Sequence, residues 1–169
     1  MKKLKAQGMK ILKVIHLILV MIWTAGSIAM AALFLIEPQT GDELYMQLST
    51  IEFIDWAMVI PGALITVFVV GVVYGLFTNW GFFKHRWLSV KWILSVAVIL
   101  IGSFYFSPHL EQALELADQL RDEALTHPDV ISHMQKAFCS AVLVCAMQLS
   151  MVLISVFKPW KKVKAKMGE

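Results

Sequence analysis

Four long apolar runs, separated by charged segments of alternating sign, constrain the fold of this chain more than any other feature. Each run has about the 20 residues that an α-helix needs to cross roughly 30 Å of hydrocarbon. A soluble core does not account for a chain that is 59% apolar and has a mean hydropathy of +0.70. We therefore expect a membrane protein whose helices cross the bilayer at residues 11–36, 56–77, 89–108 and 137–157.

The charged segments predict the orientation of these spans. Thirteen of the fifteen Lys and Arg residues lie in three patches, at the two termini and between the second and third runs. Eleven of the twelve Asp and Glu residues lie between the patches, in residues 37–55 and 111–129. Because basic segments stay on the cytoplasmic side, we expect both termini to be cytoplasmic and both acidic segments to lie outside. The predicted location is a bacterial-type cytoplasmic (inner) membrane.

The predicted fold is an all-α four-helix transmembrane bundle that forms a single domain over residues 1–169. Helical periodicity continues beyond the third run, so we expect this helix to extend outward to about residue 125. The fourth helix is expected to start at about residue 129, after Pro128. Together they form an extended helical hairpin on the outer side, whereas residues 37–55 are expected to hold only one or two helical turns. The apolar residues behind the hairpin prediction are Leu110, Leu114, Ala117, Leu120 and Ala124.

Charge placement and motif content exclude several classes of function. The basic residues gather where anionic headgroups attract them, so the expected partner is the lipid bilayer and not nucleic acid. Cys139 and Cys145 lie about 240° apart around one helix, so no internal disulfide is expected. The sequence has no Gly-rich phosphate loop, His-Glu-x-x-His, Cys-x-x-Cys or serine nucleophile elbow. Conventional hydrolase chemistry is not indicated.

Two stripes of residues at helical spacing predict the inward faces of the first and third helices, because costly polar groups in hydrocarbon face the bundle interior. His16 can bind a cofactor or can be a packing donor to a backbone carbonyl. Lys91 can point inward or can extend to the cytoplasmic headgroups. Gln148 adds a lone amide in the fourth helix. The stripes are Lys13, His16, Val20, Trp23, Ser27 and Met30 in the first helix, and Lys91, Ser95, Val98, Gly102, Tyr105 and His109 in the third.

Histidine and sulfur side chains raise two metal hypotheses. His109, His127 and His133 accompany acids on the outer hairpin, and imidazole with carboxylate suits zinc or copper. Their spacing matches no compact ligand motif, which favours solvated surface histidines over a metal site. Ten Met and two Cys residues suggest copper transport through soft ligands, but Met is also a common filler of apolar gaps.

The first helix carries Lys13-x-x-His16 and then Trp23-x-Ala25-Gly26, which resemble the opening of the HemJ type of protoporphyrinogen oxidase, a small bacterial four-helix membrane protein. A His in the first helix, a Pro-Gly in the second and a Lys in the third are also similar to the copper-resistance CopD domain and to uncharacterised bacterial membrane families. The likeness to HemJ continues in order through Pro61, Thr66, Gly71, Trp87-Leu88-x-Val90-Lys91 and Lys158-Pro159-Trp160.

The resemblance implies that His16 ligates the iron of a haem b or contacts a porphyrin, with Lys91 meeting an anionic group and Trp23 forming an aromatic wall. An enzyme of this kind would be a protoporphyrinogen-oxidase-like oxidoreductase with a membrane redox partner. The family's Tyr-His pair is missing near Ile101 and Gly102, so a second haem ligand must come from His109 or from a homodimer. The alternatives are a small membrane transporter subunit, for copper or another substrate, and a non-catalytic membrane assembly factor.

Overall fold

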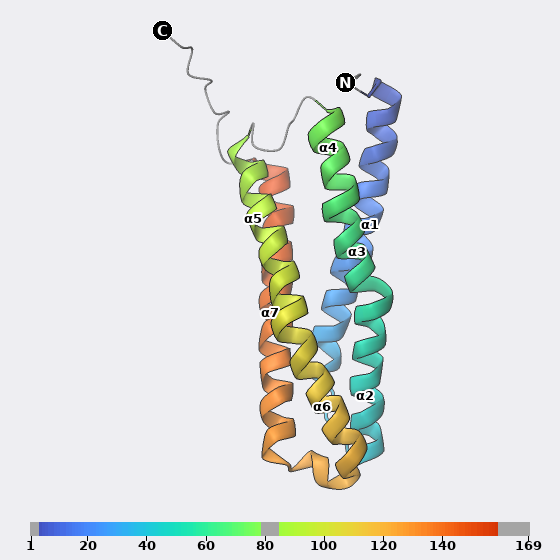
Figure 1. Cartoon of the computed structure of the whole chain (residues 1–169), viewed down its shortest axis with the longest axis vertical. Coiled ribbons are helices and arrows are strands. Elements are labelled where there is room, and N and C mark those ends of the chain that lie inside the picture. The colour runs from blue at the N-terminus through green and yellow to red at the C-terminus, as the bar shows by residue number, and fades with distance from the viewer. Residues whose placement is uncertain (1–3, 79–84, 159–169) are drawn as a thin grey trace.

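The computed structural model describes residues 4–78 and 85–158, and this part of the chain is an all-α bundle of four long helices with no β-strand (Figure 1). All four helices are long and apolar enough to cross a membrane, so the chain is a multi-pass integral membrane protein. Most basic residues of the predicted patches lie outside the described residues. So do Pro159 and Trp160, which form part of the resemblance to HemJ. The four helices cover Ala6–Leu33, Gly41–Phe77, Arg86–Leu125 and Pro128–Phe157.

Successive helices are antiparallel, and their connections lie at opposite ends of the bundle. The start of α1 (Ala6–Leu33) and the end of α7 (Pro128–Phe157) lie at one end, here called the basic end (Figure 1). The connections over residues 34–40 and 121–127 lie at the other, here called the acidic end. Both acidic segments therefore lie together, and the start of α1 and the end of α7 share a side, as the charge pattern predicts.

The second long helix begins earlier than the sequence analysis predicts, at Gly41 instead of residue 56. Thr40 caps it, because its hydroxyl accepts a hydrogen bond from the Glu43 amide at 3.2 Å. Asp42 and Glu43 in the first turn complement the helix dipole. The prediction of one or two turns was wrong because the cap and a buried face make one continuous helix. Its pieces are α2 (Gly41–Ile54), the π-helix η1 (Asp55–Val59), α3 (Ile60–Leu64), the π-helix η2 (Ile65–Gly71) and α4 (Val72–Phe77).

The third long helix changes its inward face partway along. A π-helix takes up an extra residue per turn, so residues beyond it rotate relative to an uninterrupted α-helix. Tyr105, predicted to face inward, is 47% exposed, and Phe106 is buried instead at 3%. The α-helical stripe was therefore wrong at Tyr105, although Val98 on the same stripe is buried. The pieces are α5 (Arg86–Ile101), the π-helix η3 (Gly102–Phe106), α6 (Ser107–Leu120) and the 3₁₀-helix η4 (Arg121–Leu125).

Two apolar cores follow one another along the bundle. At the acidic end, α2, α6 and the first turns of α7 pack together, which confirms the predicted helical hairpin. Nearer the basic end, a second core forms around Trp23 at the middle of the predicted spans, surrounded by exposed apolar side chains that suit lipid. The first core includes Leu44, Leu48, Ile51, Leu110, Ala113, Ala117 and Val130; the second comprises Trp23, Ala63, Val67, Val98, Val144 and Met151.

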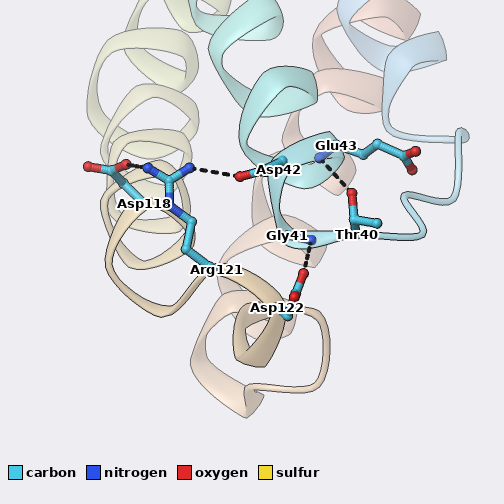
Figure 2. A network of polar contacts seen from close by, with 7 residues as sticks. All are labelled: Thr40, Gly41, Asp42, Glu43, Asp118, Arg121 and Asp122. Carbon is cyan, nitrogen blue, oxygen red and sulfur yellow. Dashed lines mark hydrogen bonds and ion pairs between the residues drawn. The ribbon is translucent and has the colours of Figure 1, made fainter.

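A polar network fastens the start of α2 to η4 at the acidic end (Figure 2). Arg121 pairs with Asp42 at 3.2 Å and also with Asp118. The Asp122 carboxylate accepts a hydrogen bond from the Gly41 amide at 2.7 Å. A Cβ atom at Gly41 would collide with the backbone of Arg121 and Asp122, so only glycine permits this approach. The network holds together the start of α2 and η4, which are distant in the sequence.

Candidate functional site

Two of the three predicted site residues, His16 and Lys91, lie in the basic half of the bundle. The half-buried His16 ring meets Tyr74 edge-on, with centroids 5.6 Å apart. Its Nδ1 atom is buried and has no hydrogen-bond partner among the described residues. Lys91 donates from Nζ to the Ser155 hydroxyl at 2.7 Å, and it lies close enough for its charge to act on the imidazole. Lys91 is therefore bonded inside the bundle.

The third predicted residue, Trp23, belongs to a different level of the bundle. It lies seven residues beyond His16 on α1, which is about 10 Å along the helix axis. Its side chain is 4% exposed and packs against Gly62, where an added Cβ would approach the Trp23 Cβ to 3.0 Å. The indole N–H is buried and finds no acceptor in the described part of the chain. The structure thus brings His16 and Lys91 near each other, with Trp23 apart from them.

Trp23 lines a cavity of about 120 Å³ between the two cores. A buried water needs about 10–15 Å³ of such space, so the cavity has room for several waters. It is smaller than the roughly 300–1,000 Å³ of typical ligand pockets. Polar side chains of α1, η1, η3 and α6 line it among apolar ones, and they are Ser27, Asp55, Ser103 and Ser107.

Asp55 is the ionisable side chain that lines this cavity. It is 6% exposed, and its Oδ2 atom accepts a hydrogen bond from the Ser107 hydroxyl at 3.2 Å. The same hydroxyl lies 3.1 Å from the Gly102 carbonyl oxygen. Because a serine has one hydroxyl hydrogen, it can donate to only one of these two acceptors at a time. When it donates to Gly102, a protonated Asp55 can donate to Ser107, so the site accommodates the carboxyl with or without its proton.

Asp55 was not predicted as a site residue, because it lies among the acids of the segment that was expected to lie outside the membrane. The signal was the helical spacing of Leu44, Leu48, Ile51 and Asp55, at i, i+4, i+7 and i+11, which places all four on one face. The three apolar members are fully buried, and Asp55 continues their face into the bundle. An acid at the end of an apolar stripe therefore predicts a buried carboxyl at this position.

Two π-helical segments border the cavity. Asp55 and Val59 line it from η1, whereas Gly102, Ser103 and Phe106 line it from η3. Single-turn π-helices inside α-helices frequently mark functional sites, because the wide turn redirects side chains and backbone groups. The two departures from α-helical geometry thus converge on the same space as the buried carboxyl.

Further polar pairs continue from this cavity toward the basic end. Gln148, which is 2% exposed, donates to the Ser27 hydroxyl at 3.0 Å, and Ser27 donates to the Trp23 carbonyl oxygen at 3.0 Å. One turn of α7 beyond this pair, Ser95 approaches the Met151 sulfur at 3.3 Å. Lys91 with Ser155 follows, about 10 Å from Gln148 along α7. Polar side chains therefore follow the bundle axis from Asp55 to Lys91.

The histidines and cysteines of the predicted metal hypotheses are only partly brought together. His109 and His133 meet with their Nδ1 atoms 3.0 Å apart, whereas His127 precedes α7 at its N-cap. The described residues hold no group of three or more His, Cys, Asp or Glu side chains suited to a metal ion. Cys139 and Cys145 are both free thiols.

Comparisons of the chain with family models, with curated proteins and with solved structures find no match. The resemblance to HemJ and CopD proteins therefore stays a prediction. The cavity does not fit the haem that this resemblance implies, because it is below the usual volume of ligand pockets and neither His16 nor Lys91 lines it. The geometry instead suits water and exchangeable protons.

Proposed function

We propose that the protein relays protons through the inside of its bundle, between Asp55 and the His16–Lys91 level. The observation that carries the proposal is the buried Asp55 carboxyl on a cavity with room for several waters. Ionisable residues inside a membrane bundle are costly, and they typically belong to ion pathways or proton relays. The relay would take up its proton at Asp55, which lies between the two cores.

The chemistry of the lining favours protons over other cargo. The cavity admits water but no sizeable solute, and carboxyl and imidazole groups exchange protons readily. The Lys91 ammonium repels metal cations at the basic end of the row. Ser27 lines the cavity between these levels, and a hydroxyl of this kind can pass a proton to a neighbouring water. The Gln148 amide holds this hydroxyl in place by donating a hydrogen bond to it.

The alternating charges predict the direction in which the proposed relay carries protons across the membrane. If both termini are cytoplasmic in a bacterial inner membrane, the acidic end faces outward and Asp55 lies toward that face. The His16–Lys91 level then lies on the cytoplasmic half. The relay would carry protons inward along the transmembrane potential, as a transport subunit or as the proton path of a larger assembly.

Proton flux into proteoliposomes tests this function. A potassium diffusion potential set by valinomycin drives the protons, and a pH-sensitive dye trapped inside reports them. We expect Asp55→Asn to reduce the flux by roughly tenfold or more, since an amide of similar size cannot exchange a proton. Glu115→Gln is the matched control, because Glu115 is an exposed acid whose carboxylate accepts a hydrogen bond from Gln119 on its own helix.

A second variant separates lost chemistry from lost folding. Asp55→Glu keeps an exchangeable proton, so it should retain a measurable part of the flux, and circular dichroism should show that both Asp55 variants stay helical. Flux in native vesicles that equals flux in protein-free vesicles would overturn the relay. Equal flux through the native protein and Asp55→Asn would remove Asp55 from it.

Haem binding by His16, as the resemblance implies, is tested with the same purified protein. Visible spectra are recorded for the oxidised and the dithionite-reduced protein from haem-replete cells. A Soret band that disappears in His16→Ala would support a haem protein. A colourless preparation that takes up no added haem would leave the proton relay as the better account.

A further inference from the structure

A pair of histidines on the predicted outer hairpin has no role in the proposed relay. His109 is in the first turn of α6 and His133 in the second turn of α7, and neither lines the cavity. Both side chains are half-buried, and their Nδ1 atoms face each other at 3.0 Å. The ring centroids are 5.1 Å apart, and Tyr105 meets His109 edge-on at 4.7 Å. The packed helices therefore bring the two imidazoles into contact.

The chemistry of this contact depends on which atoms carry protons. Two facing Nδ1 atoms can share one hydrogen, but two N–H groups cannot face each other at this distance. When both protons are on the Nε2 atoms, both Nδ1 lone pairs are free to bind a metal ion between the two rings. Neutral imidazole is a preferred ligand of zinc, nickel and copper ions.

The distance between the nitrogens matches a chelate. With metal–nitrogen bonds of about 2.0–2.1 Å, two nitrogens 3.0 Å apart define an angle at the metal of roughly 90–95°. A tetrahedral site opens this angle to about 109°, which requires the nitrogens to separate by only a few tenths of an ångström. Rotation of either ring supplies such a shift without moving the helices.

We propose that His109 and His133 form a binding site for a divalent transition-metal ion of the zinc type, bridging α6 and α7. The site lies beyond the end of the predicted third span, where ions in solution reach it. No group of three potential ligands occurs in the described residues, so water completes the coordination. Lys136, whose charge acts on His109, weakens the site without blocking it.

Zinc titration of the full-length protein in mild detergent, against a chromogenic zinc chelator near neutral pH, tests this site. The native protein should bind one equivalent. His109→Ala or His133→Ala should weaken zinc binding by roughly a hundredfold, because a single imidazole lacks the added affinity that two ligands held at one site provide. His127→Ala, which removes a histidine outside the pair, should leave the affinity unchanged.

Two further measurements separate a metal site from a structural hydrogen bond. Lys136→Gln should tighten zinc binding several-fold, because it removes a repelling charge. Zinc should raise the melting temperature of the native protein and not that of His133→Ala, as expected when a ligand binds only the folded state. The proposal is overturned if the native protein shows no saturable zinc binding, or if both alanine variants bind zinc as tightly as it does. Either result leaves the Asp55 relay intact, since these histidines take no part in it.

Discussion

At the scale of single residues, close backbone contact and buried hydrogen bonds decide where side chains can be exchanged. Gly41 begins α2 directly against the backbone of Arg121 and Asp122, and no other residue fits there. We expect Gly41→Ala to lower the free energy of unfolding by about 1–3 kcal/mol, the usual cost of overpacking. Thermal unfolding in detergent, followed by circular dichroism, measures this loss.

Gly102→Ala is the matched control for that substitution. A Cβ at Gly102 meets no atom within 4 Å, so the variant should keep the native melting temperature or exceed it, because alanine favours helices. Equal melting temperatures for Gly41→Ala and the native protein would show that the contact between α2 and η4 does not restrict this position.

The buried pair of Gln148 and Ser27 carries a second prediction at this scale. Gln148→Leu removes an interhelical hydrogen bond, which in membrane bundles is worth about 0.6–2 kcal/mol. The variant should therefore stay folded while proton flux falls several-fold, since leucine interrupts the polar row. Ser150→Ala is the control, because Ser150 is exposed and donates its hydrogen bond to the Ala146 carbonyl on its own helix. Unchanged flux through Gln148→Leu would place the proton path elsewhere.

At the scale of elements, the length of the apolar runs predicts α1 and α7 well. A single helical period does not predict the π-helices that interrupt the other two long helices. The inward stripe of the first helix is confirmed at Trp23, Ser27 and Met30, which are all buried on an unbroken α-helix. It was wrong at its first member, because Lys13 is exposed. The stripe of the third helix fails at Tyr105, because η3 adds a residue that a period of 3.6 does not anticipate. The start of α2 escaped prediction because its buried face is only a few residues wide.

The π-helix η3 therefore sets the register of α6, which can be tested by deleting Ser103. Without the extra residue, α6 rotates by about 100° and moves by about 1.5 Å relative to α5. Leu110 and Ala113 then leave the core at the acidic end. We expect amide hydrogen exchange to accelerate over α2 and α6 but not over α1. Ser103→Ala, which keeps the length, should exchange as the native protein does, and a deletion variant with native protection would contradict this role of η3.

At the scale of the whole molecule, hydropathy predicts the number of long helices, and charge predicts that α1 starts on the side where α7 ends. The cavity, in contrast, could not be predicted from the sequence alone. Asp55 and Ser107 are 52 residues apart, and their contact exists only because all four helices converge between the two cores. No local pattern specifies such a meeting. The predicted residues His16 and Lys91 were identified as polar groups in hydrocarbon, whereas Asp55 was overlooked because it precedes the apolar run.

The orientation of the whole bundle decides the direction of the proposed relay. In a variant with Cys139→Ser and Cys145→Ser, single cysteines replace Gln39 at the acidic end or Lys162, which lies outside the described residues. A membrane-impermeant maleimide should label the Gln39 site in intact cells and the Lys162 site only after permeabilisation, because basic segments remain cytoplasmic. The opposite labelling pattern would place Asp55 toward the cytoplasm, and the relay would then run from the His16 level toward Asp55.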